Sequence, residues 1–192
     1  MSEFNYFIDA IDTNTLEQFK QLCLEHGHVK HYCKHQILEK DYFGLIKSGY
    51  FRYKVFNELK KKEFITGFAF SGEYVGDYPF CLNGESSGVR IEAATMCEIL
   101  QVDTGVLKAF LKSNQPFARE VAESLFKQIY LNHLDIYRLS SEEQYRSLLS
   151  RCPQIVQKIS LKEIASYLGV TPTTISNIRR KITFERKSLK PV

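Results

Sequence analysis

A run of polar and basic side chains near the end of the sequence has the residue types that contact DNA. The run contains Pro172, Thr173, Thr174, Ser176, Asn177, Arg179, Arg180 and Lys181. Asn177 could bond an adenine edge through two hydrogen bonds in the major groove, while Thr and Ser offer weaker polar or methyl contacts. The three cations at the end of the run suit phosphates. The chemistry that these residues predict is recognition of a DNA duplex.

Such side chains need a helix-turn-helix to present them, and the surrounding sequence predicts one. Ser160 followed by Glu163 is the pattern of a capping box at a helix start. Gly169 can adopt the left-handed conformation that opens a tight turn. Thr171 then caps a second helix, whose first position suits Pro172. The inner faces of the two helices would consist of Ile164, Ala165, Leu168, Ile175 and Ile178. An ordinary helical hairpin is the alternative.

The charge of the 192-residue chain is concentrated in the same region. Residues 160–192 hold seven Lys or Arg and two Glu, a net charge of +5, so the other 159 residues together carry −1 of the chain's +4. A basic segment favours a polyanion as partner, because each neutralised phosphate releases condensed counterions. A solvated basic tail is the alternative interpretation.

Composition indicates a cytoplasmic protein without membrane contact. No apolar run approaches the roughly 20 residues of a membrane helix, and the acidic N-terminal segment does not resemble a secretion signal. The five cysteines are Cys23, Cys33, Cys81, Cys97 and Cys152. Their odd number and the lack of a C-x-x-C pair suit a reduced cytosolic protein.

The first half of the chain predicts one helix and then an antiparallel β-roll, so the fold class is α+β. Apolar residues recur at helical spacing within residues 14–27. From about residue 29 to 103, short aromatic and β-branched runs alternate with turn residues. We expect Tyr42–Lys47 and Tyr50–Phe56 to form a hairpin across Ser48-Gly49. Phe64–Phe70 should be a further strand, and Val89–Ala94 should pair with Glu98–Val102. Asp103 or Thr104 should then cap a helix over Val106–Lys112.

A long helix over about residues 116–139 carries a coiled-coil pattern. The seam consists of Ala122, Leu125, Ile129, Asn132, Ile136 and Leu139. A single Asn in such a seam can fix the register and the number of partners. We therefore expect a homodimer, and the alternative is that the stripe packs on the chain's own β-roll. The expected domains are a β-roll sensor at 1–115, a dimerisation helix at 116–139 and a DNA-binding domain at 140–192.

The C-terminal third resembles a known family of regulators. The run I-A-S-Y-L-G-V-T-P from Ile164 to Pro172, and Glu143-Gln144-Tyr145-Arg146 before it, resemble the Crp/Fnr transcription regulators, particularly a divergent branch common in Bacteroidetes. The resemblance covers nearly the whole chain, and Phe70 to Asp77 is similar to the family's turn at the effector pocket. It implies a homodimer that reads a two-fold-symmetric operator, RNA polymerase as a further partner, and a winged-helix-like DNA-binding domain. The wing would be reduced, because few residues follow the second helix.

The same resemblance implies an effector pocket, but with altered residues. The matching positions are Gly76, Asp77, Ser86, Ser87 and Arg90. Family members that bind cyclic AMP hold its ribose and phosphate with a Glu and an Arg, where this chain has Asp77 and Ser86 or Ser87. Without a guanidinium the cyclic phosphate would lose a charge-assisted pair, and Arg90 is the nearest substitute. We therefore expect an unidentified small effector and no cyclic AMP binding.

Two further departures from the family concern the cysteines and the operator. No N-terminal cysteine cluster exists, so an iron–sulfur centre is not expected, and no other cofactor is evident. Pro172 and Thr173 stand where well-known members carry Arg and Glu, so the operator should differ.

A histidine-rich segment offers a different kind of chemistry. If residues 31–35 are extended, His31, Cys33 and His35 share one face and could bind zinc, copper or haem. We favour a solvated edge strand without a metal. Cys–His catalysis has the residue types but nothing that orients the base, so an enzyme is not expected. Two alternatives remain open: a metal- or haem-responsive regulator of the same fold, and a cyclic-nucleotide-fold binding module without DNA binding.

Overall fold

The computed structural model describes residues 13–153 and 155–188. Backbone contacts divide the chain into two compact units, one that ends at Tyr130 and one that begins at Leu131. The helix α4 (Gln115–Arg138) contributes to both. No helix of the described residues is both long and apolar enough to cross a membrane.

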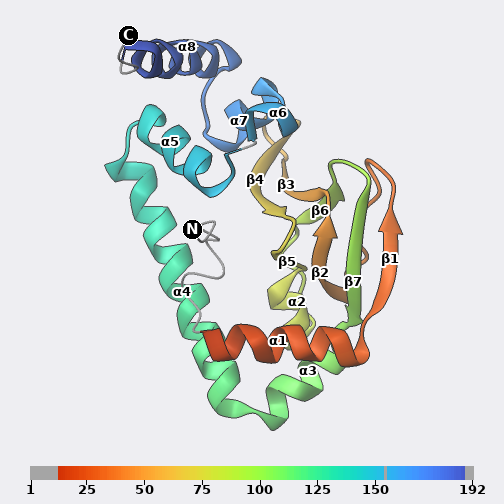
Figure 1. Cartoon of the computed structure of the whole chain (residues 1–192). Helices are drawn as coiled ribbons and strands as arrows, with labels where there is room; N and C mark the ends of the chain where they lie inside the picture. The colour runs from red at the N-terminus through yellow and green to blue at the C-terminus, as the bar shows by residue number, and fades with distance from the viewer. Residues whose placement is uncertain (1–12, 154, 189–192) are drawn as a thin grey trace. The chain divides into compact units, whose positions relative to one another are not determined.

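The first unit is built on two antiparallel sheets (Figure 1). The first has the order β1-β7-β2-β5, from β1 (His28–Tyr32), β7 (Cys97–Asp103), β2 (Tyr42–Ser48) and β5 (Tyr74–Val75). The second has the order β4-β3-β6, from β4 (Lys62–Phe70), β3 (Tyr50–Asn57) and β6 (Arg90–Ala93). Both sheets contribute to one apolar core, which includes Tyr32, Ile46, Phe51, Ala69, Ile91 and Ile99. The predicted β-roll and the α+β class are confirmed.

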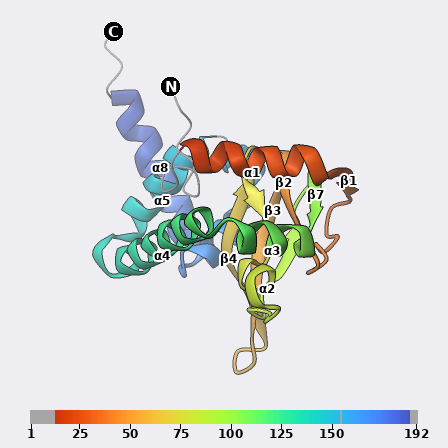
Figure 2. The same cartoon turned by 90° about the horizontal axis from the view of Figure 1, so that it is seen from below.

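Helices close one side of this roll around a second core. They are α1 (Thr13–His26), α2 (Tyr78–Asn83), α3 (Thr104–Ser113) and the first turns of α4. Both α1 and α3 pack on β2 and β7, as Figures 1 and 2 show. Phe19 lies at the centre, with its ring centroid 4.8 Å from Phe117 and 5.3 Å from Tyr74. Burial of such a side chain contributes about 1.5–3 kcal/mol to stability, so this cluster anchors the start of α4. Of the two predicted caps, Asp103 is the one that caps α3, by accepting from the Gly105 amide over 2.6 Å.

The structure corrects the predicted strand pairings. The segments 42–47 and 50–56 are strands, but they do not form a hairpin, because β2 bonds to β7 and β5 whereas β3 bonds to β4 and β6. The segments 89–94 and 98–102 also lie in different sheets. Turn residues show where a strand ends, but they do not show which strand edge it meets next. The observed hairpin joins β3 to β4 and projects from the roll in Figure 2.

Gly49 explains why the chain passes from one sheet to the other after β2. Its φ of +82° is left-handed, and a Cβ there would lie 2.5 Å from the Met96 carbonyl oxygen and 2.6 Å from the Cys97 sulfur. A glycine is therefore needed at this corner both for its conformation and for space.

The histidine-rich segment does not have the extended geometry on which a shared face depends. β1 ends at Tyr32, and residues 33–36 form a turn in which the Gln36 amide donates to the Cys33 carbonyl over 3.0 Å. His35 has a φ of +73°. His31 and His35 therefore do not lie on one strand face. Among the described residues no group of three or more His, Cys, Asp or Glu is placed to hold a metal ion.

The second unit is helical. It contains the end of α4, then α5 (Ser141–Arg151), α6 (Ile155–Lys158), α7 (Leu161–Tyr167) and α8 (Pro172–Ser188). No strand occurs within residues 131–153 and 155–188, so the described part holds no wing. α8 extends seven residues past Lys181, where the predicted helix-turn-helix ends.

Candidate nucleic-acid interface

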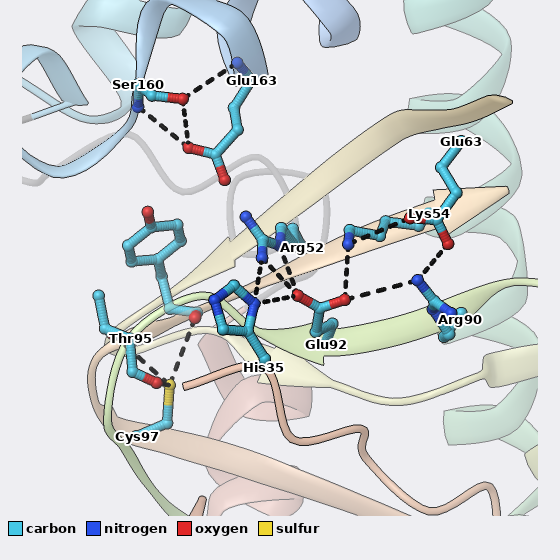
Figure 3. A network of polar contacts seen from close by, with 11 residues as sticks. His35, Arg52, Lys54, Glu63, Arg90, Glu92, Thr95, Cys97, Ser160 and Glu163 are labelled. Carbon is cyan, nitrogen blue, oxygen red and sulfur yellow. Dashed lines mark hydrogen bonds and ion pairs between the residues drawn. The ribbon is translucent and has the colours of Figure 1, made fainter. Parts of the chain in front are cut away.

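The first helix of the helix-turn-helix begins with the predicted capping box. The Ser160 hydroxyl accepts from the Glu163 amide over 3.3 Å, and the Glu163 carboxylate accepts from the Ser160 amide over 3.1 Å (Figure 3). The arrangement satisfies amides at the start of α7 that lack partners within the helix. A second capping box with the same S-x-x-E spacing, formed by Ser140 and Glu143, begins α5.

The turn between α7 and α8 also has the predicted chemistry. Gly169 has a φ of +67°, and the Val170 amide donates to the Ala165 carbonyl over 2.9 Å. The Thr171 hydroxyl accepts from the Thr174 amide over 3.1 Å, and α8 begins at Pro172. The turn therefore fixes the direction in which α8 leaves α7.

Packing then decides which face of α8 is exposed. The buried side chains of the two helices are Ile164, Ala165, Ile175, Ile178 and Ile182. The exposed residues are Pro172, Thr173, Ser176, Asn177, Arg180 and Lys181, while Thr174 is half-buried. The polar residues of the predicted reading face therefore lie together on the outside of one rigidly packed helix.

The three predicted phosphate-binding cations have different surroundings. Arg180 donates to the Asn177 amide oxygen over 3.2 Å. Lys181 is exposed and donates to the half-buried Glu142 carboxylate over 2.7 Å, which raises the pKa of Lys181 and lowers that of Glu142. Arg179 is half-buried and turns toward α5, where its Nε donates to the Tyr145 hydroxyl over 2.8 Å. Exposed ion pairs contribute little to stability, so Lys181 can exchange its carboxylate for a phosphate at small cost.

The predicted dimerisation seam lies on α4, whose exposed face is unusually apolar. Within the seam, Ile129 is 67% exposed and Ile136 is 64% exposed, whereas Leu125 packs against the first unit's own core. Other large side chains extend the apolar face: Phe126 and Tyr130 stack with centroids 5.9 Å apart, and Tyr137 is exposed. Ala122 and Asn132 are exposed, and Leu139 follows the last residue of α4.

The predicted effector residues surround the start of α2 in the first unit. Asp77 is buried, and one of its carboxylate oxygens accepts from the Ser87 amide over 3.2 Å and from the Ser86 hydroxyl over 3.3 Å. Its other oxygen is buried and has no hydrogen-bond partner among the described residues. Asp77 and Arg90 line one cavity of about 320 Å³. Gly76 precedes Asp77 in the chain, and the Gly76 amide donates to the Tyr53 hydroxyl over 3.4 Å.

Arg90 takes part in a network of charges on β3, β4 and β6 (Figure 3). It pairs with Glu63, and Glu92 at the centre is buried and accepts from Lys54 over 2.6 Å and from Arg52. Burial alone would raise the pKa of Glu92, but hydrogen bonds from Lys54, Arg52 and His35 outweigh it and lower the pKa to about 2. Because Arg90 already has a carboxylate partner, its charge is less available to a ligand phosphate.

Comparison with known proteins gives the fold. The chain resembles FixK2 from Bradyrhizobium japonicum at a TM-score of 0.67 and 16% identity over 83% of this chain and 85% of that one. A protein described as a regulator of the Crp/Fnr family from Eubacterium rectale matches at a TM-score of 0.62 and 18% identity, over 94% of this chain and 89% of that one. The catabolite activator protein of Thermus thermophilus matches at a TM-score of 0.52 and 17% identity, over 94% of this chain and 88% of that one. The chain has the Crp/Fnr fold. No protein-family model and no curated protein sequence matches it.

Within this Crp/Fnr fold, several contacts of the second unit had no sequence prediction. Tyr145 belongs to the run that resembles the family, but nothing in the sequence indicates its bond to Arg179 or the ion pairs of Glu142. The Ser140-x-x-Glu143 spacing was a usable signal for the start of α5. The assignment to a Bacteroidetes branch stays a prediction.

Proposed function

We propose that the protein is a sequence-specific DNA-binding transcription regulator that acts as a homodimer and not as an enzyme. The observation that carries this proposal is the exposed row Thr173, Ser176 and Asn177 on a helix whose opposite face is buried. These residues lie in the first two turns of α8, the part of a recognition helix that meets base edges in the major groove. Asn177 would read an adenine.

Phosphate contacts would surround this reading face. The hydroxyls of Ser160 and Thr171 lie at the starts of α7 and α8 and would contact phosphates, and the N-terminus of α8 itself favours an anion. Arg180 and Lys181 are exposed beyond the reading residues and would bind the backbone on the other side of the groove. These contacts would hold α8 in register but would not select a sequence.

Dimerisation is proposed through the apolar face of α4. Ile129 and Ile136 lie seven residues apart, which places them on one side of the helix, and Asn132 lies between them in the seam. A second copy of α4 would remove these side chains from water. The two α8 helices of a symmetric dimer would then meet half-sites about one helical turn apart on a palindromic operator.

The cavity beside Asp77 is proposed to take a small effector other than a cyclic nucleotide. Ser86 and Ser87 bond Asp77, and Arg90 bonds Glu63, so no unpaired guanidinium faces a phosphate among the described residues of this cavity. In this scheme residues 1–115 sense the effector, 116–139 join the two copies and 140–192 bind DNA in the cytoplasm. RNA polymerase would be the further partner.

Substitution of the proposed contact residues tests the DNA-binding role. On a duplex that the wild-type chain selects from a random pool, Asn177→Ala combined with Arg180→Ala and Lys181→Ala should remove specific binding. Gln157→Ala, an exposed residue of α6, is the matched control and should bind like the wild type. If the triple variant bound the duplex as tightly as the wild type, the DNA-binding role would be wrong. The alternative would then hold, a binding module whose helical tail contacts other proteins.

A further inference from the structure

A cavity between α5 and α8 in the second unit has no role in the proposed function. Its volume is about 510 Å³, within the range of small-molecule sites. Leu149, Pro153 and Ile182 form an apolar wall, and Ser150 and Thr183 contribute hydroxyl groups. A cavity that is apolar on one side and polar on the other suits a small amphipathic molecule.

Arg179 supplies the polar side of this cavity. Its Nε donates to the Tyr145 hydroxyl over 2.8 Å, and its guanidinium carbon lies 5.8 Å from the centroid of the Tyr145 ring. Its Nη2 is buried and has no hydrogen-bond partner among the described residues. A guanidinium has five N–H donors, so most of the donors of Arg179 remain unused. A buried donor without a partner is unfavourable, and an acceptor in the cavity would relieve that cost.

The neighbouring charges select the kind of acceptor. Arg146 also lines the cavity, but it already pairs with Glu142 at 2.8 Å and Glu185 at 2.5 Å. Arg179 is therefore the cation of the described cavity wall that lacks a carboxylate partner. Arg146 and Lys181 balance the charges of Glu142 and Glu185. The one remaining positive charge matches a monoanion better than a dianion such as a phosphate monoester. A planar carboxylate also fits the two parallel donors of a guanidinium edge.

We propose that this cavity binds a small carboxylate with an apolar body. The carboxylate accepts hydrogen bonds from Arg179, and the apolar body lies against Leu149, Pro153 and Ile182. The site is separate from the effector cavity beside Asp77. Because Arg179 belongs to α8, an occupied site would couple a metabolite directly to the helix that carries the proposed reading face.

Three matched small molecules test the chemistry on the full-length chain without DNA. Phenylacetate has the carboxylate and an apolar ring, phenylacetamide is its neutral analogue, and phenyl phosphate carries the same ring on a dianion. Titration calorimetry should show phenylacetate binding with a Kd in the millimolar range, as expected of a fragment. The amide should bind at least about tenfold more weakly because it carries no charge, and so should the phosphate because its two charges exceed the one unpaired positive charge of Arg179. No binding of phenylacetate, or equal binding of the amide, would overturn the proposal.

Substitutions locate the site and separate it from DNA binding. Arg179→Gln and Ser150→Phe, which fills the cavity without changing Arg179, should each weaken phenylacetate binding about tenfold or more. Arg180→Gln is the control and should leave phenylacetate binding unchanged while weakening duplex binding. If Arg179→Gln does not fold, Ser150→Phe decides. Normal phenylacetate binding by Ser150→Phe, or by a folded Arg179→Gln variant, would overturn the site. Since the titrations use no DNA, failure of the proposed regulator role would not affect them.

Discussion

Arg179 of α8 donates a hydrogen bond of 2.8 Å to the hydroxyl of Tyr145, a side chain of α5 that is 1% exposed. The bond holds the proposed recognition helix against α5. Tyr145→Phe would leave a half-buried guanidinium donor without its acceptor, which costs about 1–3 kcal/mol. Urea denaturation should show this loss in the free energy of unfolding. Tyr137→Phe, on an exposed face of α4, is the control, and an equal loss in both variants would contradict the assigned role.

Glu92 should make the stability of the first unit depend on pH. Its pKa is about 2 in the folded chain and near 4.5 when unperturbed, so the stabilisation is complete above about pH 5 and is lost as the pH falls toward 2. At 1.36 kcal/mol per pKa unit the effect is about 3 kcal/mol. Glu92→Gln should therefore destabilise the chain at pH 7 and much less at pH 3. Glu58→Gln, an exposed hairpin residue, should show no such dependence, and a constant deficit for Glu92→Gln would refute this account.

Gly49 should tolerate alanine much less well than Gly72. Gly49 has a φ of +82° and Gly72 a φ of +89°. A Cβ added at either position therefore introduces backbone strain of about 1–3 kcal/mol. At Gly72 nothing lies within 4 Å of the added Cβ, whereas at Gly49 backbone and sulfur atoms lie under 3 Å away. Thermal or urea denaturation should show a larger loss for Gly49→Ala. Similar losses would mean that the corner between the sheets can shift without cost.

The dimer should depend on one side of α4. Ile129→Glu places a charge in the proposed seam and should give a monomer at micromolar concentration by sedimentation equilibrium. Leu131→Glu lies two residues on, about 200° around the helix, and should leave the dimer intact. If both variants were monomers, or if the wild-type chain were a monomer, the seam on α4 would not be the dimer interface.

Local chemistry explains what the sequence could predict. The capping box at Ser160, the left-handed Gly169 and the start of α8 at Pro172 depend on residues within four positions of one another, and all three were predicted. The strand pairings depend on residues far apart, so the corner at Gly49 was mistaken for a hairpin.

Side-chain direction was equally hard to predict. Residue types at positions 179–181, in the middle of α8, indicate three phosphate-binding cations, but Arg179 lies at the border between the buried and exposed faces and bonds Tyr145, 34 residues earlier. Arg90 is the nearest substitute for a phosphate-binding arginine, but it pairs with Glu63 on β4, the strand on the other side of β3. In both cases the partner comes from a distant segment that spacing alone does not identify.

Sequence-specific DNA binding by a symmetric dimer through α8 is the function proposed for this protein. Its most direct test is selection of bound duplexes from a random pool by the full-length chain, followed by measurement of affinity at several salt concentrations. We expect a palindrome with half-sites about one helical turn apart, affinity that falls steeply with salt, and loss of preference at one base pair of each half-site in Asn177→Ala. A pool that shows no enrichment, with no duplex bound at any salt concentration, would contradict the account.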